Sequence, residues 1–95
     1  MYRTETNRLH KIARMPGFLM ILSNHAERRM AERDIARFEL ERVLKTGLVT
    51  MIEHDPDGTE RWRVSGRDAD GKSIAAVVEP LPPAAALVVT VIRVG

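Results

Sequence analysis

The sequence predicts an α+β domain in which two or three N-terminal helices pack on a four-stranded antiparallel sheet. Three observations lead to this fold class. Apolar residues recur at helical spacing through the first half, and from Leu48 onward they follow a period of two. The pairs Asp57-Gly58 and Asp70-Gly71 then read as tight turns between strands. A chain of 95 residues is long enough for one small core, so the two halves are expected to share it.

The first segment, over residues 4–15, is expected to form a weak amphipathic helix. Its apolar residues at helical spacing are Leu9, Ile12 and Ala13. Thr4 or Thr6 is the expected N-cap, and Pro16-Gly17 ends the segment. We therefore divide the chain into an N-terminal extension over residues 1–17 and a single α+β domain over residues 18–95.

A short apolar segment, Phe18–Leu22, leads into the next helix. It reads either as a buried strand or as the apolar entry into that helix. Ser23 is a good N-cap for a helix that ends near Arg33, and its buried edge is expected to contain Ala26 and Met30. Asp34 stands where the chain has to break, and Asp tolerates left-handed backbone better than most residues.

The next helix is expected over residues 36–46, with Gly47 as the C′ residue after it. Four strands should follow, over residues 48–53, 60–66, 72–79 and 87–94. The prolines Pro80, Pro82 and Pro83 are expected to hold the last connection open. Together these elements complete a helical half followed by a β-meander.

The side-chain pattern of the strands indicates which faces are buried. In the second strand Trp62 and Val64 point to the core, whereas Arg61, Arg63 and Ser65 point the other way. The last two strands are apolar on both faces, and simple alternation in the final strand places Leu87, Val89 and Val91 on one side with Val88 and Ile92 on the other. One helical layer covers one face only. The second face is therefore expected to be covered by the N-terminal helix, by a second copy or by a partner.

Composition narrows the class of protein. The chain has no cysteine, which excludes disulfides and thiolate metal sites and fits a reducing cytoplasm. Its apolar segments are too short to cross a bilayer, so we expect a soluble cytoplasmic protein without membrane contact. The net charge is +2, but the first 45 residues hold ten basic and six acidic residues, which concentrates positive charge on the helices.

The run His25-Ala26-Glu27-Arg28-Arg29-Met30-Ala31-Glu32-Arg33-Asp34-Ile35 resembles the opening of an uncharacterised bacterial family, a domain of unknown function that begins His-Ala-x-x-Arg-Met-x-x-Arg-Gly-Ile. The similarity spans Leu22 to Val94. Asp34 stands where the family has Gly, and Ala36 replaces the hydroxyl residue that would cap the next helix. The family is distantly similar in element order to the RelE, ParE and MqsR-like toxins, which implies a RelE-like fold.

The resemblance implies a toxin-like domain that acts on RNA as a metal-independent endoribonuclease without a cofactor, with an antitoxin-like protein as a further partner. His25 would be the base, because the nearby cations of Arg28 and Arg29 favour a neutral imidazole. Arg63 would act beside it on the phosphate. The expected nucleic-acid contacts are Arg28, Arg29, Arg33, Arg61 and Arg93.

Each of these residues also has a structural reading. His25 near a helix N-terminus can be a packing residue, the arginines can form a solvated face, and Trp62 suits the core better than base stacking. His54 lies among acids beside an Asp-Gly turn, where loop chemistry explains it better than a metal site does. His10 has no evident partner. The alternative function is a non-catalytic protein-interaction module, a homodimer or a binder of an antitoxin-like partner, which uses the doubly apolar strands.

Overall fold

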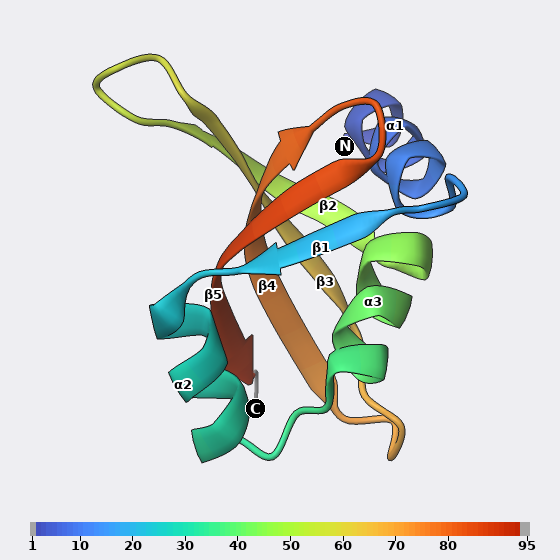
Figure 1. The fold of residues 1–95 in the computed structure, drawn as a ribbon, viewed down its shortest axis with the longest axis vertical. Helices are drawn as coiled ribbons and strands as arrows, with labels where there is room; N and C mark the ends of the chain where they lie inside the picture. Colours follow the sequence, from blue (N-terminus) through green and yellow to red (C-terminus); the bar gives the residue numbers. More distant parts are fainter. Residues whose placement is uncertain (1, 94–95) are drawn as a thin grey trace.

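The computed structural model describes residues 2–93, and within them three helices and a five-stranded mixed sheet form one α+β unit (Figure 1). The helices are α1 (Arg3–Ala13), α2 (Asn24–Glu32) and α3 (Arg37–Thr46). The strands are β1 (Leu19–Leu22), β2 (Leu48–His54), β3 (Glu60–Arg67), β4 (Ser73–Leu81) and β5 (Ala85–Arg93). The predicted last strand ended at Val94, which lies outside the described residues.

The junction between α2 and α3 follows local sequence signals. Ser23 caps α2, since its Oγ accepts a hydrogen bond of 3.0 Å from the backbone N–H of Ala26. Asp34 has the left-handed φ of 54° that its position predicted. Ala36 offers no side-chain cap, but its own N–H donates to Glu39 Oε1 at 2.9 Å. Half of a capping box therefore remains at the start of α3.

Helix α1 is attached to the domain by side chains whose roles were not predicted. Thr6 is not an N-cap: its Oγ1 accepts a 3.0 Å hydrogen bond from the backbone N–H of Val49 in β2. His10, which had no evident partner, places Nε2 2.7 Å from the carbonyl oxygen of Gly47. Arg14 donates to the carbonyl of Lys45 at 2.7 Å. The exposed carbonyls at the end of α3 are thus satisfied by α1, and Leu9 is fully buried in the common core.

The sheet order is β1-β5-β4-β3-β2, so the prediction of four antiparallel strands was wrong in one respect. Residues 19–22 form a fifth strand that pairs in parallel with β5, with Ile21 opposite Leu87. A parallel pair needs a long crossover, and here it joins residues more than sixty positions apart. Local periodicity contains no signal for such a partner.

A bulge changes which side chains of β5 face the core. The pairing register between β4 and β5 shifts at Val77 and Val78, so that Val88 pairs with Val78 and Thr90 with Val77. Val88 and Val91 are consequently both buried on one face. The simple alternation that placed them on opposite faces was therefore wrong, because one inserted residue reverses the parity.

All three helices contribute to a single core on one face of the sheet. The core cluster joins Leu9 of α1, Met30 of α2 and Leu40 of α3 with Trp62 and Val64 of the sheet. The prediction that Trp62 and Val64 point inward is confirmed. Helix α1 does not cover the second face, however, and within residues 2–93 no other helix does so. That face, which we call the open face, is exposed to solvent.

Two close approaches set the distance between α3 and the sheet. A Cβ on Gly66 would lie 3.0 Å from Val43 Cγ2, and one on Gly47 would lie 2.6 Å from the Ser65 carbonyl oxygen. Gly47 was expected as the C′ residue, a position that is often left-handed, but its φ of −76° and ψ of −178° are extended. Its role is steric: it lets the end of α3 pass directly over β3.

Candidate functional site

The predicted site residues fall into three separate places. His25, Arg28 and Arg29 line a shallow pocket on the outer side of α2, together with Glu32. Its volume is about 190 Å³. His25 and Arg28 are exposed, and Arg29 forms an ion pair of 3.4 Å with Glu32. The helix face that the sequence singled out therefore exists, but no sheet residue lines it.

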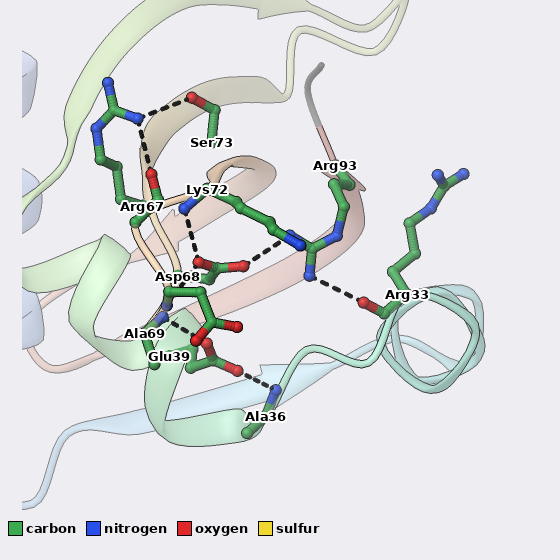
Figure 2. Close-up of polar contacts among 11 residues, drawn as sticks. Arg33, Ala36, Glu39, Arg67, Asp68, Ala69, Lys72, Ser73 and Arg93 are labelled. Atoms are coloured by element: carbon green, nitrogen blue, oxygen red, sulfur yellow. Dashed lines mark hydrogen bonds and ion pairs between the residues drawn. The ribbon is translucent and has the colours of Figure 1, made fainter.

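Arg93 belongs to a second place, a carboxylate network formed by Glu39, Asp68 and Arg93 (Figure 2). Arg93 Nη1 donates to Asp68 Oδ2 at 2.7 Å, and its Nη2 donates to the carbonyl oxygen of Arg33 at 2.9 Å. Figure 2 shows the Arg33 guanidinium directed away from this network. Arg93 thus joins β5 to the end of α2, and both of its terminal nitrogens have protein partners.

The two carboxylates of this network are held in their charged form. The hydrogen bond from Arg93 lowers the pKa of Asp68, and the N–H groups of Lys72 and Asp70 add to this effect against the opposing effect of burial. The N–H of Ala69 lowers the pKa of Glu39, followed by that of Ala36. A carboxylate that accepts several hydrogen bonds is a poor proton donor at neutral pH. The network therefore serves to hold α2, α3 and the β3–β4 turn together.

A cavity of about 480 Å³ adjoins this network. Its wall includes Phe38, which is 64% exposed, and the side chains of Asp70 and Lys72. The charge of Arg93 is paired with Asp68 at 2.7 Å, and the carboxylates of Glu39, Asp68 and Asp70 also line this cavity, so it is a poor site for an anion. We regard it as the surface depression between α3 and the β3–β4 turn.

The third place lies on the open face, where Arg61 and Arg63 project as the alternation predicted. Arg61 pairs with Asp55 at 3.1 Å. Arg63 instead lines a groove of about 540 Å³ at the edge of the sheet, which we call the arginine groove. Its polar lining consists of Arg42, Arg63, Arg67, Thr46, Ser65 and Ser73. No carboxylate side chain lines it.

Arg42 and Arg67 were not among the predicted site residues. Arg42 lies on the outer side of α3, and Arg67 lies one residue past the expected end of its strand. The period-two series Arg61, Arg63, Ser65 and Arg67 was visible in the sequence and could have indicated one polar row. The contribution of Arg42 depends on the close packing of α3 against β3, which a sequence pattern does not reveal.

The open face also carries apolar side chains. Leu19 and Ile21 of the edge strand β1 are 56% and 38% exposed, and Leu48 and Met51 of β2 are 59% and 44% exposed. The cross-strand pairing places Ile21 beside Leu87, so the apolar surface continues from β1 onto β5. Because β1 and β2 are the two opposite edges of the sheet, these side chains form two separate apolar patches, and the one on β1 and β5 is the candidate interaction surface.

Neither a metal-ligand cluster nor a membrane-spanning helix is found among residues 2–93. Within residues 2–93, no group of three or more His, Cys, Asp or Glu side chains is arranged to hold a metal ion. His54 Nε2 lies 3.9 Å from Glu60 Oε2, and the two side chains are 64% and 42% exposed. No helix in this part of the chain is both long enough and apolar enough to span a membrane.

Comparison with known proteins supports one assignment. A family model described as "Domain of unknown function (DUF4258)" matches residues 22–93. The matched region begins at the end of β1, so helix α1 lies before it. Neither the curated proteins nor the solved structures contain a significant match.

Proposed function

The chain belongs to the DUF4258 family, a domain of unknown function, and we propose that it acts as a non-catalytic interaction module whose open face pairs with a second copy of the chain. One observation carries the proposal. All three helices cover the same face of the sheet, and the other face exposes four large apolar side chains, two on each edge strand. A face of this composition is stabilised when a partner removes it from water.

The distribution of charge favours a second copy as the partner. We define the apolar half of the open face by Leu19 and Ile21 of β1, Leu87 and Ile92 of β5, and Val77 of β4. These five residues carry no charge, and their charged cross-strand neighbours on this face, Glu79 opposite Leu87 and Arg63 opposite Val77, have opposite signs. In the same arrangement Arg61 and Arg63, which lie on β3, remain at the rim of the interface. A two-fold interface is self-complementary by construction.

The size of the apolar half sets the expected strength. A standard interface buries about 800 Å² on each partner, and half of one small sheet face offers less. We therefore expect a concentration-dependent dimer with a Kd in the micromolar range or weaker. This corresponds to a binding free energy of about −8 kcal/mol or one that is less favourable. The edge position of β1 leaves this half accessible.

Sedimentation of the full chain from about 10 μM to about 1 mM measures this association directly. Ile21→Glu places a charge in the apolar half and should leave the chain monomeric. Phe38→Glu is the matched control, because Phe38 is 64% exposed but lies on α3. A parent chain that is monomeric throughout the range, or equal loss of dimer in both variants, refutes the second copy as the partner.

The endoribonuclease remains a second candidate. Arg63 favours it, since this side chain lines a groove with two further arginines. The difficulty is His25, which lines a different pocket, and no histidine lines the arginine groove. A phosphate held at Arg63 would have no imidazole beside it for proton transfer, and general base catalysis requires hydrogen-bonding reach.

Induced expression in bacteria tests the ribonuclease. If the domain cleaves RNA with these residues, the parent chain inhibits growth, and His25→Ala or Arg63→Ala relieves the inhibition. Arg3→Ala serves as the control, since Arg3 is exposed on α1. Unimpeded growth with the parent chain present at full length would end this hypothesis.

A further inference from the structure

We propose that the arginine groove binds a phosphate group. The inference goes beyond self-association, because the groove is formed by α3, β3 and the starts of β2 and β4, whereas the apolar half lies mainly on β1 and β5. The phosphate-binding proposal and the ribonuclease hypothesis both involve Arg63. Phosphate binding in the groove does not require RNA cleavage, and separate experiments test binding and cleavage.

The charge of the groove is the first argument. Guanidinium groups remain charged at every relevant pH, so Arg42, Arg63 and Arg67 place three cations around one depression. Within residues 2–93 none of the three forms an ion pair with a carboxylate. Repulsion among them is relieved when an anion enters. Guanidinium also matches the geometry of phosphate oxygens, to which it donates two parallel hydrogen bonds.

The packing of α3 against β3 sets where Arg42 lies along the groove. Gly47 and Gly66 have no side chains, and a Cβ at either position would collide with its neighbours. Because these two residues have no side chains, α3 can lie close against β3, and Arg42 reaches the wall of the groove. The guanidinium groups of α3 and β3 therefore line the same groove.

Arg67 is oriented before any ligand arrives. Its Nη1 donates to the carbonyl oxygen of Gly71 at 2.9 Å and to Ser73 Oγ at 3.4 Å (Figure 2). Both of these bonds use Nη1, which leaves Nε and Nη2 to donate to a phosphate. A side chain that is already ordered loses less conformational entropy on binding.

Hydroxyl groups complete the polar lining. Ser65 and Ser73 lie on neighbouring strands and their hydroxyls can donate to a second phosphate oxygen. Thr46 is different, because its Oγ1 donates to the carbonyl of Arg42 at 2.8 Å. The volume of about 540 Å³ exceeds that of one phosphate and leaves room for an attached group beside exposed Leu48. The phosphate is therefore expected to belong to a larger ligand, either an RNA backbone or a phosphorylated small molecule.

Titration of the full chain with two probes tests the site, with backbone amide chemical shifts as the readout. The probes are inorganic pyrophosphate and a single-stranded oligoribonucleotide of about eight residues, which suits the usual footprint of such sites. We expect the shifts to concentrate at Ser65, Gly66 and Ser73. If the oligoribonucleotide binds more tightly than pyrophosphate, the bound phosphate belongs to an RNA backbone. If pyrophosphate binds as tightly or more tightly, the ligand is a small phosphorylated molecule.

Two variants of equal charge separate a site from general attraction. Arg42→Gln with Arg67→Gln removes two cations from the groove and should weaken binding of the preferred probe about tenfold or more. Arg3→Gln with Lys11→Gln removes two exposed cations of α1 and should change it less than about twofold, because contributions from distant charges are screened by salt. Absence of shifts at the groove with either probe, or equal weakening by both variants, overturns the proposal.

Discussion

Helix α1 lies before the region that the family model matches, yet the structure makes it part of the core. Leu9→Ala measures how far the rest of the domain depends on it. The Leu9 side chain is 0% exposed and packs in the same cluster as the residues of α3 and the sheet. The substitution removes three carbon atoms, which costs about 2.4 kcal/mol at roughly 0.8 kcal/mol each before any cavity is counted.

The cavity left behind increases this cost, and Leu→Ala substitutions in cores cost about 2–5 kcal/mol. We expect about 3 kcal/mol here. A domain of 95 residues is stable by roughly 5–14 kcal/mol, so the loss is a large fraction of the total. With a urea dependence of about 1.5 kcal/mol per molar, the midpoint of unfolding falls by about 2 M.

Trp62 provides the assay. It is the single tryptophan of the chain, it is 1% exposed, and the Arg8 guanidinium of α1 lies 5.5 Å from its ring centroid. Its fluorescence therefore reports both global unfolding and the docking of α1. Leu48→Ala is the matched control, because Leu48 is 59% exposed and should cost no more than about 0.5 kcal/mol. A loss below about 1 kcal/mol for Leu9→Ala, or one no larger than the control, would show that α1 is not integral to the core.

Two further predictions concern the carboxylate network and the packing of α3. The pKa values of Glu39 and Asp68 are lower in the folded chain than their ordinary values of 4.5 and 3.8. Both carboxylates therefore stabilise the folded chain when the pH is above these ordinary values. This stabilisation is lost as the pH falls through the lowered pKa values. Urea midpoints from pH 7 to about pH 3 should accordingly fall less steeply for Asp68→Asn than for the parent; an unchanged slope would contradict the assignment. Gly66→Ala places a Cβ 3.0 Å from Val43 Cγ2 and should cost about 1–3 kcal/mol. Val43→Ala in the same chain should recover part of that loss, and strictly additive costs would exclude the contact as its cause.

Several local features were predictable because their causes are local. Ser23 caps α2 as expected, and Asp34 adopts the left-handed conformation that its place between two helices requires. Gly58 and Gly71 in the two Asp-Gly pairs have φ values of 86° and 80°, as tight turns demand. In each case the signal lies within a few residues of the feature, so no knowledge of the partner strands was needed.

The roles of the predicted site residues were harder to predict. Arg93 was expected to contact phosphate, but in the folded chain its guanidinium is bonded to Asp68 and to the carbonyl of Arg33. Arg63 was correctly placed on the outer side of its strand, whereas its neighbours Arg42 and Arg67 in the groove were missed. Whether an arginine is free or paired depends on which carboxylate approaches it, and that carboxylate can be 25 residues away, as Asp68 is.

The helical and strand halves, the turns between the meander strands and the inward position of Trp62 can all be predicted from the amino-acid sequence, because hydrophobic periodicity and backbone preferences act over short stretches of chain. Three further features emerge only in the folded chain: β1 joins the sheet in parallel, a bulge in the pairing of β4 with β5 reverses the parity of Val91, and all three helices cover one face. These outcomes depend on contacts between residues far apart in sequence. They also determine the function we propose, since they leave one sheet face open and bring three arginines together at its edge.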